Sequence, residues 1–191
     1  MKIKKSVIIL SGGKNSRMNY KTKAFLTFNN KRFIDIIIDQ LSDYDEIIIS
    51  CNNDNEYEYL KDKSKLVKDC ITNIGPIGGI YSCLKVCKNE HALVVAADMP
   101  FLSKETLNFL GSQDFKEDAL ICKVGNTYEV LSSVYSKSCL DKMKDMIDKG
   151  NYKILDLIKN LNVKIVEIEC NKEFSNINTL KEYSEIKSQE I

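Results

Sequence analysis

Residues 92–97 read Ala-Leu-Val-Val-Ala-Ala, and Asp98, Met99 and Pro100 follow directly. The run contains no polar residue, so other parts of the chain must cover both faces of the strand that it predicts. Strands buried on both faces are typical of parallel sheets with helices on each side. We therefore expect a central parallel strand here, with Asp98 at its carboxyl end.

The first 110 residues continue this pattern, because short apolar runs alternate with amphipathic segments. Strands are predicted at residues 7–10, 47–49 and 65–68. Apolar positions at helical spacing predict a helix over 33–41, and a proline suited to a first turn opens another helix at Gly75-Pro76. A short helix over 54–61, and one capped by Ser103 that runs to about Leu110, complete this half. The alternation predicts a three-layer α/β/α Rossmann-like fold with a mainly parallel central sheet.

The remaining residues contain fewer signals of this kind. Two strands are expected at 119–124 and 128–135, separated by the turn residues Gly125 and Asn126. Two helices at 137–148 and 152–160, a half-exposed strand at 163–168 and a last helix from about Asn178 follow. At 191 residues the chain suits a single domain over 1–191.

Composition excludes several classes of protein. Lys and Arg number 28 against 27 Asp and Glu, and the net charge of +1 creates no field that would attract nucleic acid. Seven scattered cysteines and a single histidine, His91, argue against a zinc site, so we expect buried, reduced thiols in a reducing compartment. The apolar run at 7–10 is too short for a signal core or a membrane span. These features predict a cytoplasmic protein without membrane attachment.

The first candidate site is the loop Leu10-Ser11-Gly12-Gly13, which follows a predicted strand at the sheet edge where such folds bind ligands. Glycines allow backbone N–H groups to approach an anion closely. Arg17 and Lys23 add positive charge along the loop, which suits a triphosphate. Neither a P-loop nor a G-x-G-x-x-G motif is present, so a simple turn beside a solvated basic loop is the alternative.

Two carboxylates also follow predicted strands. Asp98 is placed to supply a ligand for Mg²⁺, which favours one or two carboxylates together with phosphate oxygens. Asp69 precedes Gly75-Pro76-Ile-Gly78-Gly79, whose glycines permit close approach to a ligand. A turn role for either aspartate, and tight helix packing at the glycines, are the alternatives.

Together these segments resemble the molybdenum cofactor guanylyltransferase family of nucleotidyltransferases. The resemblance runs in order along nearly the whole chain and is carried by the following segments: Leu10–Gly13, Arg17-Met18 and Lys23; Asn30–Phe33; Ile49–Asn52; Asp69 with Gly75–Gly79; Ala97–Phe101; Glu129-Val-Leu-Ser-Ser-Val-Tyr135; and Asn176-Ile-Asn178-Thr179.

The resemblance implies that GMP passes from GTP to the phosphate of molybdopterin with release of pyrophosphate, and that Mg²⁺ is required. It implies that about residues 1–110 bind the nucleotide and about 111–191 bind the acceptor. It assigns catalysis to Lys23, Arg17 and Asp98, with Asp98 on the metal. The implied nucleotide site comprises Leu10, Ser11, Gly12, Gly13, Lys23, Ser50, Asn52, Asp69 and Asp98, and the implied acceptor site Asn176 and Asn178. Transient contact with cofactor-insertion proteins is also implied.

Several positions depart from the family pattern. Asn19 stands in place of Gly and Thr22 in place of Asp, and Arg32, Val130 and Leu180 each replace a proline. Ser50 replaces an asparagine. Two alternatives therefore stay open: a related enzyme that uses CTP or a sugar- or polyol-phosphate acceptor, and a non-catalytic protein that binds the cofactor or a nucleotide.

Overall fold

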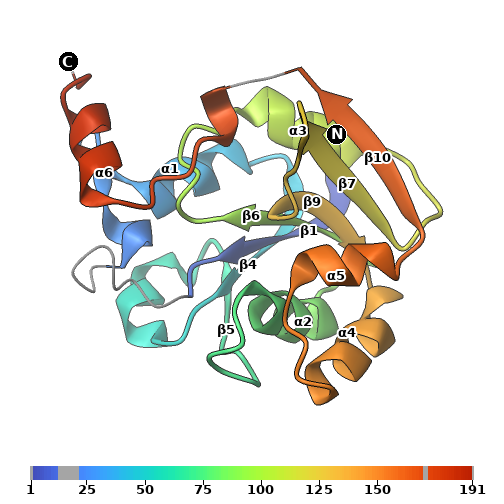
Figure 1. Ribbon diagram of the computed structural model, residues 1–191. Coiled ribbons are helices and arrows are strands. Elements are labelled where there is room, and N and C mark those ends of the chain that lie inside the picture. The colour runs from blue at the N-terminus through green and yellow to red at the C-terminus, as the bar shows by residue number, and fades with distance from the viewer. Residues whose placement is uncertain (1, 13–21, 170–171, 191) are drawn as a thin grey trace.

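The computed structural model describes residues 2–12, 22–169 and 172–190, which form a central sheet with helices on both faces (Figure 1). The strand order is β10-β7-β9-β6-β1-β4-β5, with β8 beside β7. Within the described part of this sheet, β8 and β9 alone run against the other strands, so the predicted mainly parallel three-layer fold is confirmed. The sheet strands are β1 Ile3–Leu10, β4 Tyr44–Ser50, β5 Lys65–Val67, β6 His91–Ala96, β7 Ala119–Val124, β8 Thr127–Tyr128, β9 Ser132–Ser136 and β10 Val163–Ile168.

Helices cover the sheet in two layers, and alternate side chains of the strands point to each layer. Val7 and Ile9 of β1 pack in one apolar cluster with α1 and α3, whereas Ile8 packs in a second cluster with α2, α4 and α5. The helices are α1 Phe33–Gln40, α2 Pro76–Val86, α3 Lys104–Ser112, α4 Cys139–Asp148, α5 Ile154–Lys159 and α6 Leu180–Lys187, and 3₁₀ turns cover Lys23–Phe25, Asp54–Leu60 and Lys172–Phe174.

The expected strand over 128–135 is wrong, because a turn divides it. Ser132 N–H donates to the Glu129 carbonyl at 2.9 Å, so the chain bends between β8 and β9. As a result β8 pairs with β7 alone, while β9 lies between β7 and β6. An additional hairpin was not predicted: β2 (Thr27–Phe28) pairs with β3 (Lys31–Arg32) around Asn29 and Asn30, which adopt φ values of 47° and 59°.

The last helix, α6, packs on this hairpin rather than on the main sheet. Ile177 and Ile186 form a small cluster with Leu26 and Phe33, and Tyr183 packs against it. The Tyr183 hydroxyl donates to the Thr27 carbonyl at 3.0 Å. Residues 26–33 and the C-terminal helix are thereby brought together at the edge of the molecule where α6 and α1 lie in Figure 1.

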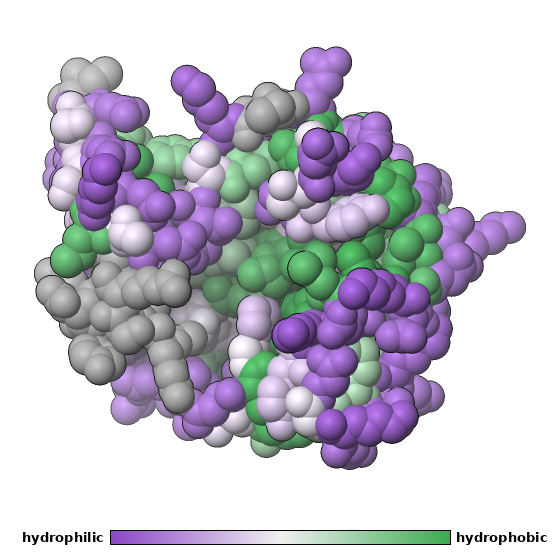
Figure 2. All heavy atoms as spheres, in the orientation of Figure 1, coloured by the Kyte–Doolittle hydropathy of each residue, from purple (hydrophilic) through white to green (hydrophobic). Residues whose placement is uncertain are grey.

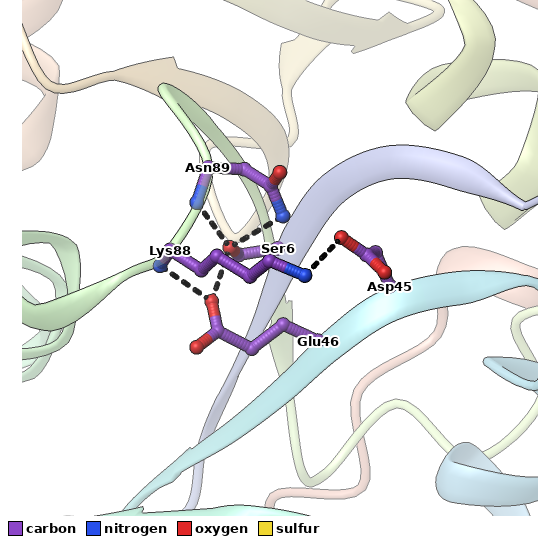
Figure 3. Close-up of polar contacts among 5 residues, drawn as sticks. All are labelled: Ser6, Asp45, Glu46, Lys88 and Asn89. Carbon is purple, nitrogen blue, oxygen red and sulfur yellow. Dashed lines mark hydrogen bonds and ion pairs between the residues drawn. The ribbon is translucent and has the colours of Figure 1, made fainter.

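Away from the carboxyl ends of the strands, a polar network joins the amino halves of β1 and β4 to the turn before β6 (Figure 3). The buried Ser6 hydroxyl donates to the Glu46 carboxylate and accepts from the Asn89 side-chain amide at 3.3 Å. Glu46 also accepts from the Lys88 backbone N–H at 2.8 Å, and the Lys88 ammonium donates to Asp45 at 2.9 Å. The network gives these polar side chains hydrogen-bond partners at a distance from the carboxyl ends of the strands. No helix in the described part of the chain is long and apolar enough to cross a membrane.

Candidate active site

A cleft of about 500 Å³ lies at the carboxyl ends of β1, β4 and β6. Figure 2 shows a hollow near the middle of this face, bordered on one side by hydrophobic side chains. The segments that follow three parallel strands meet here, as expected for ligand sites in such sheets. The cleft is lined by Leu10, Ser11, Gly12, Lys23, Ala24, Ser50, Asn52, Asp69, Asn73, Gly75, Pro76, Gly79, Ala96, Ala97, Asp98 and Leu131.

The loop after β1 passes between the ends of β4 and β6. Ser11 N–H donates to the Ser50 carbonyl, and Ala97 N–H donates to the Leu10 carbonyl, both at 3.0 Å. A side-chain carbon on Gly12 would lie 3.5 Å from the Asn52 amide nitrogen and 3.8 Å from an Asp69 carboxylate oxygen. The three predicted nucleotide-binding positions Gly12, Asn52 and Asp69 therefore lie close together in the wall of the cleft.

Asp69 is held by a buried hydroxyl. Ser50 Oγ, which is only 1% exposed as a residue, donates to Asp69 Oδ1 at 2.7 Å. Burial raises the pKa of Asp69, and the Ser50 hydrogen bond opposes part of that rise. The serine that departs from the family's asparagine thus keeps a polar contact with the aspartate and fixes the orientation of its carboxylate.

Lys23 and Asp98 form the charged centre of the cleft. The Lys23 ammonium lies 2.7 Å from Asp98 Oδ2 and 2.6 Å from Asn178 Oδ1, although Asn178 is 155 residues away in sequence. The side chains of Lys23 and Asp98 are 20% and 19% exposed, so each is open to a ligand while largely shielded from solvent. A charge-assisted contact of this kind presents one cation and one carboxylate in fixed positions.

The C-terminal segment holds this centre in place. Ile177 N–H donates to the Asp98 carbonyl at 2.9 Å. Glu182 accepts from the backbone N–H groups of Asn178 and Thr179 at 2.6 Å and 2.9 Å, and it forms the capping box of α6. Asn178 is thereby fixed by the start of α6, and Asp98 is tied to the same segment.

Two glycines of the 75–79 segment pack tightly, as the alternative interpretation of that segment proposed. A side-chain carbon on Gly78 would lie 2.7 Å from the Ile71 carbonyl, and one on Gly79 would lie 2.6 Å from Ser50 Oγ. A side-chain carbon on Gly75 would meet nothing within 4 Å, but this residue has a φ of 74°, a conformation that favours glycine, and it directly precedes α2 as its N-cap. These glycines bring α2 against the ends of β1 and β4 and so shape the wall of the cleft.

The predicted residues are not all placed together. Gly13 and Arg17 lie outside the described residues. Asn176 is exposed and does not line the cleft, whereas Asn178 contacts Lys23.

Tyr57 and Leu131 were not among the site residues predicted from the sequence. The buried Tyr57 hydroxyl hydrogen-bonds Ser11 Oγ, and burial raises the pKa of Tyr57 to about 12, which keeps it neutral. No local motif distinguishes this tyrosine from a core residue, whereas Leu131 belongs to the segment from Glu129 to Tyr135 that carried part of the resemblance.

The cysteines within the described residues are free, as expected, and all but Cys70 are buried. Burial raises the pKa of Cys51 to about 11 and that of Cys122 to about 12, so both are neutral thiols near pH 7. Among the described residues that line the cleft, none is a cysteine.

The cleft brings together a carboxylate, an ammonium group and a glycine loop at the carboxyl edge of a parallel sheet. This arrangement is typical of the class of α/β proteins that bind phosphate-bearing ligands. A family model described as the MobA-like NTP transferase domain matches residues 7–164. The chain belongs to this family.

Curated relatives and solved structures agree with this assignment. A "Probable molybdenum cofactor guanylyltransferase" of Clostridium perfringens is 44% identical, over 99% of this chain and 100% of that protein. One with the same description from Natranaerobius thermophilus is 34% identical, covering 91% and 90%. The crystal structure of molybdopterin-guanine dinucleotide biosynthesis protein A from Archaeoglobus fulgidus superposes with a TM-score of 0.80 at 26% identity, covering 96% and 97%.

Proposed function

We propose that this protein transfers GMP from GTP to the phosphate of molybdopterin, forming the guanine dinucleotide of the cofactor and releasing pyrophosphate. The observation that carries the proposal is the Lys23–Asp98 pair, held at 2.7 Å in the same cleft as Gly12 and Asp69. This family makes such a dinucleotide by nucleotidyl transfer, and the C. perfringens relative named for it is similar along its entire length. GTP is therefore the nucleotide that we expect this cleft to bind.

The reaction is a displacement at phosphorus. An oxygen of the acceptor phosphate forms a bond to the α-phosphorus of GTP, and the bond from that phosphorus to the bridging oxygen breaks. The electron pair of the broken bond stays on pyrophosphate. The acceptor phosphate is already ionised at neutral pH, so the step needs positioning and charge neutralisation more than proton transfer.

Each residue has a distinct task in this proposal. Lys23 neutralises charge that develops on the phosphates, and Asn178 keeps its ammonium group aimed into the cleft. Asp69 orients the nucleotide beside the Gly12 loop, with Ser50 fixing the carboxylate. Arg17 and Gly13 are proposed to act on the triphosphate from the loop that follows β1.

The residues present fit a magnesium ion that is bound by the protein together with the substrate phosphates. No cluster of three or more His, Cys, Asp or Glu able to hold a metal occurs among the residues that the structure describes. One carboxylate supplemented by phosphate oxygens is, however, the donor set typical of Mg²⁺ in nucleotide sites. Asp98 would hold the ion, and the ion would supply positive charge to stabilise the phosphate groups.

We further propose one domain over residues 1–191, in which about residues 1–110 bind GTP and 111–191 bind the acceptor. Asn178 would then contribute to the charged centre from the acceptor half, and the exposed Asn176 would contact the acceptor. We expect a cytoplasmic enzyme that passes its product to cofactor-insertion proteins by transient contact.

The decisive experiment combines the protein with GTP, Mg²⁺ and molybdopterin, and measures both pyrophosphate and guanylated pterin. Both products are expected in equal amounts. A thermal-shift series should show stronger stabilisation by GTP than by CTP, UTP or ATP. Stabilisation by CTP with product from a sugar- or polyol-phosphate would replace the proposal, and nucleotide binding without pyrophosphate release would identify a non-catalytic protein.

A further inference from the structure

The turn between β8 and β9, residues 129–131, carries part of the resemblance but has no task in the reaction described above. It lies beside the cleft, because Leu131 is one of the lining residues. Ser132, the next residue, pairs with Val95 of β6, three residues before Asp98. The turn is therefore at the same edge of the sheet as the charged centre, on the side away from the Gly12 loop.

The backbone of this turn is held by several hydrogen bonds. Glu129 N–H donates to the Cys122 carbonyl at 2.8 Å, and the Glu129 carbonyl accepts from Ser132 N–H at 2.9 Å and from Ser133 Oγ at 2.8 Å. The fully buried Tyr135 donates its hydroxyl to the Val130 carbonyl at 2.8 Å. These bonds give Ser133 and Tyr135 a structural role in the turn, but they use only the backbone of residue 129.

The Glu129 carboxylate, in contrast, makes no hydrogen bond or ion pair with any residue that the structure describes. Its backbone bond to Cys122 continues the ladder of β7 and β8, which places the two side chains on the same face of the sheet. Cys122 belongs to the apolar cluster that also contains Val124 and Leu131. Burial in this apolar setting raises the pKa of Glu129, so ionising its carboxyl group costs free energy that no described residue offsets in the absence of a ligand.

We infer that the Glu129 carboxylate accepts N–H donors from the ring of the acceptor, a fused heterocycle that bears an amino group beside a ring N–H. This inference rests on the proposed function, in which the acceptor is a pterin. A carboxylate with two free oxygens matches the adjacent donors of a 2-amino-4-oxo ring in the same plane. The apolar side chains around it would pack against the flat ring, as in most ligand sites.

Geometry assigns this contact to the acceptor rather than to the guanine. Gly12, Asn52 and Asp69 converge around the ends of β1 and β4, whereas Glu129 lies beyond β6 beside β7 and β9. The charged Lys23–Asp98 pair lines the cleft between these two regions. A nucleotide beside Gly12 and a pterin beside Glu129 would both place their phosphates toward the Lys23–Asp98 pair.

The test compares Glu129→Gln with Glu167→Gln, because Glu167 is an exposed carboxylate on the same half of the sheet, paired with Lys123. In Glu129→Gln we expect kcat/KM for molybdopterin to fall about ten- to hundredfold, the range for a lost hydrogen bond to a charged group, with KM for GTP unchanged. Glu167→Gln should match wild type in both. Thermal unfolding should show Glu129→Gln to be at least as stable as wild type. If Glu129→Gln does not fold, Glu129→Asp is the second variant, and its kcat/KM for molybdopterin should also fall.

A binding measurement separates this inference from the proposed function. Fluorescence titration with pterin and with lumazine, which has an oxo group in place of the 2-amino group, should show a preference for the pterin in wild type. The preference should disappear in Glu129→Gln. Equal binding of both ligands by wild type, or unchanged kcat/KM in Glu129→Gln, would overturn the inference while leaving guanylyl transfer in place. Pterin preference without pyrophosphate release would overturn the proposed function alone.

Discussion

Replacing Asp98 with Asn removes one negative charge from the centre of the cleft and keeps the shape of the side chain. Asp98 Oδ2 lies 2.7 Å from the Lys23 ammonium, and the side chain is 19% exposed. The carboxylate is the group that we propose for Mg²⁺, and an amide is a poor ligand for that ion. The substitution therefore tests the charge of Asp98 with little change in packing.

The effects on turnover and on stability should differ in size. Losing a preorganised charge contact in a shielded site lowers turnover by roughly 10² to 10³, or about 2.7–4 kcal/mol of transition-state stabilisation. The free energy of unfolding should change by no more than about 1 kcal/mol, because the ion pair is partly exposed and Lys23 keeps its contact with Asn178. For a chain of this length that corresponds to a shift in Tm of about 2–4 °C.

The assay measures pyrophosphate release at saturating GTP and molybdopterin over a range of Mg²⁺ concentrations, with Tm determined in parallel. Lys23→Ala should lose turnover on a comparable scale. Asp145→Asn is the matched control, because Asp145 pairs with Lys149 at 2.7 Å on the exposed surface of α4, where both side chains are more than 60% exposed. Wild-type turnover in Asp98→Asn would refute the role of the carboxylate, as would an equal loss in Asp145→Asn.

Three further substitutions test other parts of the site and fold. Gly12→Ala should fold normally, because its methyl group would meet Asn52 and Asp69 at ordinary contact distances. The methyl group would occupy the space between these two side chains, so calorimetry should show GTP affinity reduced at least about tenfold. Burial raises the pKa of Asp69, so the ionised carboxylate destabilises the fold above that pKa. In acid the carboxyl group is protonated in both the folded and the unfolded state, and this destabilisation disappears. Asp69→Asn should therefore raise Tm at pH 7 and leave it unchanged near pH 3, about one unit below the ordinary carboxyl pKa. Ser103→Ala removes the cap that accepts from Thr106 N–H at 3.2 Å, which should cost about 1 kcal/mol of stability in denaturant unfolding and leave turnover unchanged.

Much of the fold follows from local sequence because burial imposes a local pattern. The run at 92–97 is apolar throughout since β6 has strands on both sides and helices on both faces. Gly75-Pro76 marks the start of α2 since Gly75 adopts positive φ and proline fits the first turn. Once these strands are parallel, the positions of Gly12, Asp69 and Asp98 at one edge follow from the rule that their carboxyl ends coincide.

What the sequence did not reveal depends on contacts between distant segments or on very short elements. The β2–β3 hairpin has two residues in each strand, too few to show alternation, and its Asn29-Asn30 turn was the only local signal. The hydrogen bond between Tyr57 and Ser11 joins the 3₁₀ turn after β4 to the loop after β1, and neither residue lies in a pattern that names the other. The break between β8 and β9 arises from the backbone bonds of Glu129, which periodicity cannot detect.

The contact between Lys23 and Asn178 shows what this long-range arrangement contributes to function. A lysine side chain loses about 2 kcal/mol of conformational entropy when it is fixed in one rotamer. Here the Asn178 amide and the Asp98 carboxylate fix Lys23, while Glu182 fixes Asn178 through the cap of α6. That entropy is therefore lost when the chain folds, and not when the triphosphate binds or reacts. The C-terminal segment thus acts on the reaction by ordering the charged centre before any substrate arrives, which is the condition under which a fixed cation is most effective.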